Sequence, residues 1–197
     1  MSDRVVIALL APAGWAPPGI DPGAWQRALA EDVVDLLATL AAADIAIAAA
    51  RTELVLAEAI AWPGMPVYEL DVPTPLAALH RAAAAGHLMG AVLAADAPDL
   101  PGMLVGKLLQ PLTSRFAAVA PASGGGLLGV ASRLPVPGWL PGIDFDTDHA
   151  ERVRVAAPRP AMVAVTPGWH RLRGPADLAR LDPALEGWET TRRLLGG

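Results

Sequence analysis

Short apolar runs that alternate with alanine-rich segments constrain the fold of this chain more than any other feature. Val5–Leu10 and Leu88–Ala95 contain no charged residue, a composition typical of strands that are buried on both faces of a sheet. Strands are expected at Val5–Leu10, Asp44–Ala50, Pro66–Leu70, Leu88–Ala95 and Phe116–Pro121. Helices are expected between them, at Ala24–Ala42, Thr52–Ile60, Thr74–Ala85 and Pro101–Gln110. This alternation predicts a Rossmann-type α/β sandwich of three layers, in which a mostly parallel sheet carries helices on both faces.

The second half of the chain departs from this alternation. A strand expected at Leu127–Ser132 directly follows a glycine-rich turn, which indicates an antiparallel excursion within the sheet. A late strand at Ala161–Thr166 and two short helices at Pro175–Leu181 and Leu185–Leu195 complete the expected elements. Neither a repeat nor a second domain is evident in the sequence, so residues 1–197 are expected to form a single domain.

Composition excludes several classes of function. The 197 residues include no cysteine, which removes disulfide scaffolds, zinc ribbons and cysteine nucleophiles. The net charge of −5 and the aromatic content of 5% argue against binding of a nucleic acid polymer. The longest nearly uncharged stretches, 36–50 and 82–95, fall short of the roughly 18 to 20 apolar residues that a membrane span needs. The first residues do not have the pattern of a signal peptide, and the chain is expected to be cytoplasmic.

Charge is distributed unevenly along the chain. Residues 1–150 hold 15 acidic and seven basic side chains, whereas residues 151–197 hold five acidic side chains and eight arginines. Two interpretations stay open. The basic tail is a solvated helix, or it helps to hold an anion such as a diphosphate at the edge of an acidic domain.

The carboxyl ends of the expected strands are the places to look for a ligand site, because open α/β sheets bind ligands where the strand order reverses. Asp96 follows a buried strand, and its carboxylate would suit Mg²⁺ or Mn²⁺ that bridges phosphate oxygens, or would simply fix the turn. Asp99 is expected to cap the next helix. Pro12, Ala13 and Gly14 begin the loop after the first strand, where a base and phosphates would be cradled.

Other motifs near this edge have plain structural explanations. Trp15 and Trp25 are expected to pack rather than to stack on a base. Gly124–Gly129 has the spacing of dinucleotide-binding glycines, but a strand follows it instead of a helix, which argues against a NAD site. These glycines would form a plain hairpin turn or let a backbone approach a ligand closely. The acidic run Asp144–Asp148 is more typical of a solvated loop than of a cation site.

Several segments resemble one known family, in order and at plausible spacing. They are Leu93–Leu100, Ala118–Val130, Pro141–Thr147 and the stretch from Trp169 to Leu181. Together they resemble the DUF2064 glycosyltransferase family of the nucleotide-diphospho-sugar transferase (GT-A) superfamily. The resemblance implies a GT-A-like fold with Asp96 in the metal and phosphate site. It also implies that Gly124 and Gly125 line the sugar or acceptor pocket, with Ser123 where the family has an aspartate.

This chain departs from the family pattern near the C-terminus. The family's Asp-x-Asp-Thr-Pro stands here as Arg171-Leu172-Arg173-Gly174-Pro175. Arginine cannot ligate Mg²⁺, but it can neutralise a diphosphate. Either Arg171 and Arg173 replace a metal ion, or catalysis has been lost.

Two functions follow from the resemblance. The first is glycosyl or nucleotidyl transfer from a nucleotide or nucleotide sugar, assisted by Mg²⁺ or Mn²⁺ on Asp96 as the catalytic residue. Pro12, Ala13 and Gly14 would then contact the substrate, as would Ser123, Gly124, Gly125, Arg171 and Arg173. The second function is a non-enzymatic binding or interaction protein on the same fold. Fold alone does not decide between an enzyme and a binding protein.

Overall fold

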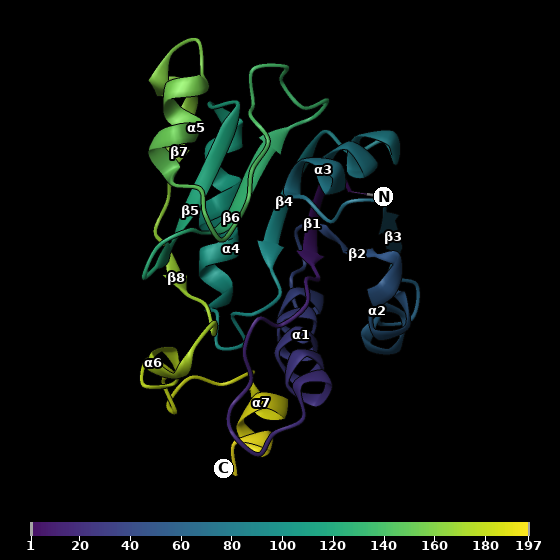
Figure 1. The fold of residues 1–197 in the computed structure, drawn as a ribbon. Coiled ribbons are helices and arrows are strands. Elements are labelled where there is room, and N and C mark those ends of the chain that lie inside the picture. Colours follow the sequence, from purple (N-terminus) through teal and green to yellow (C-terminus); the bar gives the residue numbers. More distant parts are fainter. Residues whose placement is uncertain (1, 197) are drawn as a thin grey trace.

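Eight strands form one mixed sheet in the computed structural model, which describes residues 2–196 (Figure 1). The strands are β1 (Arg4–Leu9), β2 (Asp44–Ala50), β3 (Val67–Leu70), β4 (Met89–Ala94), β5 (Ala117–Ser123), β6 (Leu127–Arg133), β7 (Val163–Val165) and β8 (Trp169–His170). Their order is β3-β2-β1-β4-β6-β5-β7, and β8 pairs with the end of β5. Strand β6 runs antiparallel to both of its neighbours, and the other pairings are parallel. The expected α/β fold, mostly parallel with an antiparallel excursion, is confirmed.

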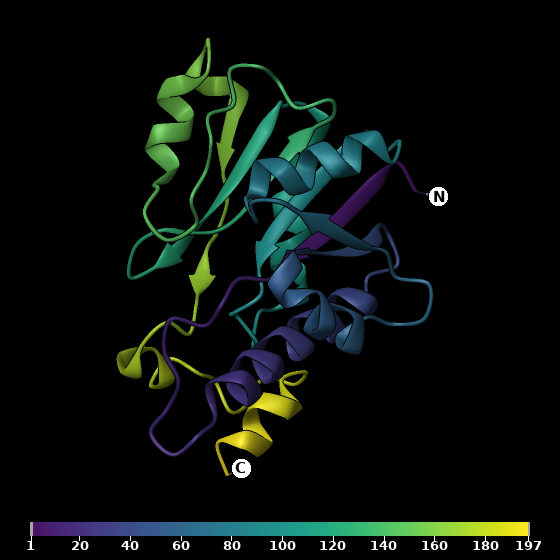
Figure 2. The ribbon, with the colours of Figure 1, turned by 45° about the vertical axis from the view of Figure 1, so that its right-hand side comes forward.

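Helices cover both faces of the sheet (Figure 2). They are α1 (Pro22–Ala38), α2 (Leu54–Ile60), α3 (Pro75–Ala84), α4 (Gly102–Leu109), α5 (Ala150–Ala156), α6 (Pro175–Leu178) and α7 (Glu189–Leu194). Helices α3 and α5 pack into one core layer, while α1, α2 and α4 pack into the other. Among the described residues, no helix combines the length and the apolar composition that crossing a membrane requires.

Strand β1 shows why its sequence is apolar throughout. Val5 and Ile7 point into the core that α3 and α5 cover, and Val6 and Ala8 point into the core on the opposite face. Because successive side chains of a strand alternate between faces, a central strand must be apolar at every position. Its neighbours β2 and β4 complete a parallel register in which Val5 lies opposite both Asp44 and Gly90.

Two elements, α5 and β8, lie outside the expected set. Helix α5 has seven residues and no side-chain cap, and β8 has two residues, so neither is long enough to produce a recognisable period. A third difference concerns the helix expected over Thr52–Ile60. It begins with a 3₁₀ turn at Arg51–Glu53, and α2 starts only at Leu54.

A third, smaller apolar cluster joins the loop after β1 to the C-terminal segment. Trp25 and Leu29 of α1 form its buried centre with Leu172, and Trp15 packs against them. The rings of Trp15 and Trp25 lie 6.1 Å apart, edge to face, a favourable aromatic geometry. Both tryptophans therefore pack, as expected, and they hold the loop in place at the end of the molecule toward which β1 and β4 point (Figure 1).

The carboxylate of Asp32 connects α1 to the start of α7. The Asp32 side chain on α1 accepts hydrogen bonds from the backbone amides of Thr190 (3.0 Å) and Thr191 (2.7 Å) in the first turn of α7. Burial raises the pKa of Asp32, and the hydrogen bonds from Thr191 and Thr190 oppose that shift. Asp32 thus acts as an N-cap supplied from a distant helix, and α7 lies along α1 (Figure 2).

Replacing Asp32 with alanine should lower the free energy of unfolding by about 1–2 kcal/mol, because two amides of α7 lose their acceptor. Urea unfolding followed by circular dichroism measures this loss. The matched control is Glu31→Ala, which removes a similar charge from an exposed pair with Arg27 and should cost less than about 0.5 kcal/mol. Equal losses in the two variants would show that Asp32 does not cap α7.

Candidate ligand-binding cleft

A cleft of about 390 Å³ opens at the carboxyl ends of β1 and β4. Its wall is formed by residues 9–14 after β1, residues 94–96 after β4, the start of α3, and the segments 143–146 and 171–173, together with part of α1. From β1 the chain proceeds outward to β2 and β3, and then crosses to β4 on the other side of β1. The cleft therefore lies where the strand order reverses, the usual ligand position in such sheets, and its volume suits a small ligand.

The main electrostatic feature of the cleft is an ion pair between Asp96 and Arg171. The Nε and Nη2 atoms of Arg171 donate to the two carboxylate oxygens of Asp96 over 2.6 and 2.8 Å. The backbone reinforces this pairing, because the amide of Leu172 donates to the carbonyl oxygen of Asp96 over 2.8 Å. A two-point contact of this kind fixes both the position and the orientation of the guanidinium.

The remaining nitrogen of Arg171 is also fully engaged. Its Nη1 donates to the carbonyl oxygens of Leu127 (3.2 Å) and Phe145 (3.0 Å) and lies 2.8 Å from Oδ1 of Asp146. Only 7% of the Arg171 side chain is exposed. Burial opposes its charge, but the carboxylates of Asp96 and Asp146 outweigh burial and raise the pKa of the Arg171 guanidinium. Arg171 is thus a permanently charged group held on all sides by acceptors.

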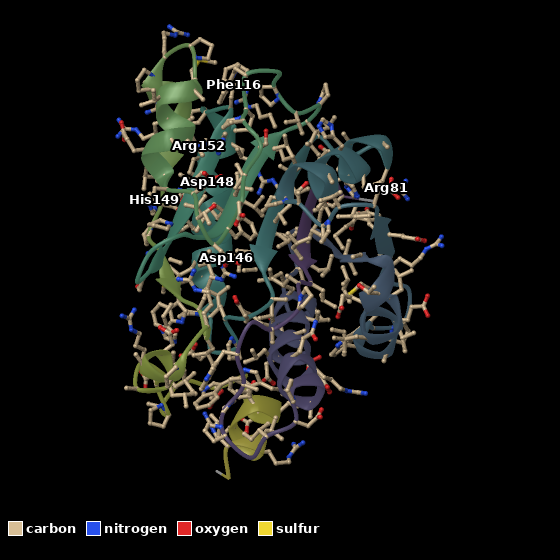
Figure 3. All side chains as sticks on the ribbon, viewed as in Figure 1. Arg81, Phe116, Asp146, Asp148, His149 and Arg152 are labelled. Carbon is tan, nitrogen blue, oxygen red and sulfur yellow. The ribbon has the colours of Figure 1, made fainter. Side chains whose placement is uncertain are left out.

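Arg173 extends this arrangement into a row of alternating charges. Its Nη1 lies 3.6 Å from Oδ1 of Asp146, and its Nη2 donates to the carbonyl oxygen of Gly125 over 2.7 Å. Its side chain is 28% exposed, unlike that of Arg171. Asp146 therefore lies between the two arginines, at the lower edge of the sheet in Figure 3.

The donor set at Asp96 does not fit a divalent cation. Both oxygens of Asp96 already accept hydrogen bonds from Arg171, whereas Mg²⁺ and Mn²⁺ need free carboxylate oxygens. Across residues 2–196, no three histidine, aspartate or glutamate side chains are grouped so that they could hold a metal ion. In this arrangement Asp96 is paired with Arg171 and is not available as a metal ligand.

The acidic run Asp144–Asp148 is a loop that hydrogen-bonds to itself. The amide of Asp146 donates to Asp144 Oδ1 over 2.7 Å, and the amide of Asp144 donates to Asp148 Oδ2 over 2.8 Å. Arg152 on α5 neutralises Asp148 over 2.7 Å, and both side chains lie farther up the molecule than Asp146 in Figure 3. These contacts position Asp146 next to Arg171, a partner that the sequence analysis missed.

The glycine-rich turn at 123–126 is a hairpin between β5 and β6. The amide of Ala122 donates to the carbonyl oxygen of Gly126 over 3.0 Å, and Gly126 has a φ of +79°. A side chain there would collide with the carbonyl oxygen of Phe145, so glycine is required. Of the expected substrate contacts, Ser123, Gly124 and Gly125 lie outside the described cleft wall, while Pro12, Ala13, Gly14, Asp96, Arg171 and Arg173 lie within it.

The expectation that Asp99 caps the next helix is wrong. The cap residue of α4 is Pro101, and no side chain caps the helix. Asp99 is buried instead, accepts a hydrogen bond from Trp169 Nε1 over 3.1 Å and lies 2.9 Å from Nε2 of His170. Through these contacts Asp99 holds β8 against the loop after β4. Arg171, the residue after β8, is thereby positioned next to Asp96.

Gln26 is a cleft residue that sequence reasoning also missed. Its Nε2 donates to the carbonyl oxygen of Ala11 over 3.1 Å and to Glu53 Oε2 over 2.7 Å, and the residue lines the cleft. Its position could have been predicted, because Gln26 lies one turn before Leu29 and Ala30 on the helix that follows the candidate loop. Gln26 supports the loop after β1 from the side of α1.

Comparisons with known proteins connect this architecture to transferases. Neither a family model nor a curated protein matches the sequence. Among solved structures, one provisionally described as a nucleotide-diphospho-sugar transferase from Desulfovibrio desulfuricans G20 is similar over 100% of this chain and 96% of its own, with 17% identity and a TM-score of 0.67. Glucosyl-3-phosphoglycerate synthase from Mycobacterium tuberculosis, in complex with Mg²⁺ and UDP, is similar over 98% and 77%, with 14% identity and a TM-score of 0.57.

A CMP:2-keto-3-deoxy-manno-octonic acid synthetase complexed with CTP is also similar in structure. The similarity covers 90% of this chain and 95% of the synthetase chain, with 14% identity and a TM-score of 0.55. At these identities the likenesses show the fold alone, which is that of the nucleotide-diphospho-sugar transferases and nucleotidyltransferases.

Replacing Arg171 with alanine should lower the free energy of unfolding by about 3 kcal/mol, because Asp96 and two carbonyl groups lose their partner. The loss stays at the low end for a buried ion pair since 25% of the Asp96 side chain reaches water. Chemical denaturation gives the value. Arg152→Ala, which breaks a more exposed pair with Asp148, is the control and should cost less than about 1 kcal/mol. A similarly small loss for Arg171→Ala would contradict the central role of the ion pair.

Proposed function

We propose that this chain is a nucleotide-binding protein on a transferase fold, with a nucleotide or nucleotide sugar as its ligand. The observation that carries the proposal is the cleft of about 390 Å³ at the point where the strand order reverses between β1 and β4. The solved structures with UDP and CTP support the choice of ligand, since both proteins share this fold. Membership of the DUF2064 family and a single domain over 1–197 stay predictions.

In this proposal, Pro12, Ala13 and Gly14 form the wall against which the nucleoside packs. Their loop is supported from α1 by Gln26. Arg173 provides the partly exposed positive charge for a phosphate group, because a guanidinium donates to phosphate oxygens at two points.

The ion pair at Asp96 favours a binding protein over a metal-assisted transferase. Transfer of the kind implied by the family resemblance would use Asp96 as a metal ligand, and here its two oxygens are occupied by Arg171. A catalytic role for Asp96 is therefore not part of the proposed function. The expected result is that nucleotide sugars bind without being turned over.

A phenylalanine in place of Gly14 should block the cleft without disturbing the fold. Gly14 lines the cleft, has no positive φ and has open space where a side chain would begin. Thermal unfolding in the presence of the common ribonucleotides and nucleotide sugars should show stabilisation of the unaltered chain and a loss of at least tenfold in affinity for Gly14→Phe. The melting temperatures of the two free proteins should agree.

Gly138→Phe is the matched control for this experiment. Gly138 also has open space around it and no positive φ, but it lies outside the cleft wall. It should bind nucleotides as the unaltered chain does. Absence of stabilisation by every nucleotide and nucleotide sugar tested, with and without Mn²⁺, would refute the proposed function.

A further inference from the structure

We infer that the guanidinium of Arg171 is the resident cation of this cleft, so that ligand binding needs no divalent metal and favours nucleotides of low charge. The inference rests on the proposed function and specifies its ligand. Nucleoside monophosphates and nucleoside diphosphate-sugars are the classes that fit, and nucleoside triphosphates are the class that does not.

Arg171 occupies the place beside Asp96 that a metal ion would need. Its guanidinium contacts both oxygens of Asp96, at the end of β4 and inside the cleft. A divalent cation at Asp96 would have to displace a group that is also held by Leu127, Phe145 and Asp146. The alternative, a cation beside the guanidinium, brings two positive groups together. Since arginine does not lose its proton in proteins, this competition does not weaken as the pH rises.

The cleft wall carries more acidic than basic side chains. The wall carries the positive charges of Arg171 and Arg173 and the negative charges of Asp96, Asp144 and Asp146. The two carboxylates of Asp96 and Asp146 more than neutralise Arg171, which leaves Arg173 as the more exposed positive charge of the wall. A phosphate monoester carries about 1.5 to 2 negative charges near neutral pH. Each additional phosphate group adds negative charge that the wall does not offset.

A metal-dependent site and an arginine-based site differ in how they recognise a phosphate chain. A metal-dependent site gains affinity as the phosphate chain lengthens, because the cation bridges successive phosphate groups. A site with a fixed and already paired arginine behaves in the opposite way, since added charge is repelled by Asp144 and Asp146. The dependence of affinity on phosphate number therefore distinguishes the two kinds of site.

Isothermal titration of the full chain tests this inference. The probes are the four ribonucleoside monophosphates, the corresponding triphosphates, and UDP-glucose as a diphosphate-sugar, each in EDTA and in millimolar Mn²⁺. The best monophosphate should bind with the same Kd, within twofold, in both solutions. Its triphosphate should bind roughly tenfold more weakly in EDTA. Binding that requires Mn²⁺, or a triphosphate that binds most tightly in EDTA, would overturn the inference and leave the proposed function intact. No binding under any condition would instead overturn the proposed function.

Asp96→Asn supplies a second test that separates the two possible roles of Asp96. The amide oxygen can accept one of the two hydrogen bonds from Arg171, while the amide nitrogen loses the other. One negative charge also leaves the wall, so the monophosphate should bind about three- to fivefold more tightly in EDTA. Glu58→Gln removes the same charge from an exposed position on α2, outside the cleft wall, and should leave the Kd unchanged. Weaker binding by Asp96→Asn that appears only in Mn²⁺ would identify Asp96 as a metal ligand and refute the inference.

Asp144→Asn keeps the test decisive if Asp96→Asn does not fold. Its side-chain oxygen can still accept from the amide of Asp146, and the charge of the cleft wall changes by the same amount. Tighter monophosphate binding in EDTA is expected again. An unchanged or larger Kd in this variant would show that charge in the wall does not select the ligand.

Discussion

The contact between Arg171 and Asp96 is the interaction on which the candidate site depends. It connects the end of β4 to the segment that follows β8, and the same guanidinium also holds the carbonyl oxygens of Leu127 and Phe145. A buried guanidinium is tolerated only when its donors find acceptors. Because Arg171 meets this condition, four segments that are far apart in the sequence are fixed around one side chain, and the cleft has a defined wall.

Much of the fold can be predicted from the sequence because the central strands are apolar at every position, which indicates that both of their faces are buried. Val5–Leu10 is apolar at every position, and the structure places these side chains alternately in two cores. Elements that are stabilised by residues distant in the sequence have no comparable local pattern. Strand β8 exists because Trp169 and His170 pair with the end of β5, and α5 is held by the burial of Val153. Neither segment has a period of its own long enough to be read.

The candidate site was predictable in location but not in its contacts. The position of Asp96 after a buried apolar run predicted a side chain at the carboxyl edge of the sheet, and the structure places it there. Its pairing with Arg171 joins residues 75 positions apart, and nothing local in the sequence specifies such a pair. Asp99 illustrates the same limit, because its place before α4 is typical of a cap, while tertiary packing brings Trp169 and His170 to its carboxylate.

The late position of Arg171 in the chain also orders the events of folding during synthesis. Residues up to Arg133 supply the strands β1 to β6, so most of the sheet can assemble while the ribosome is still adding residues. At that stage Asp96 has no guanidinium beside it, and the side chain of Trp25 lacks its packing contact with Leu172. Until that stretch emerges, the carboxylates of Asp96 and Asp146 lack the guanidinium that pairs with them. The wall of the cleft is thus complete only after the segment that contains Arg171 and Leu172 has been synthesised.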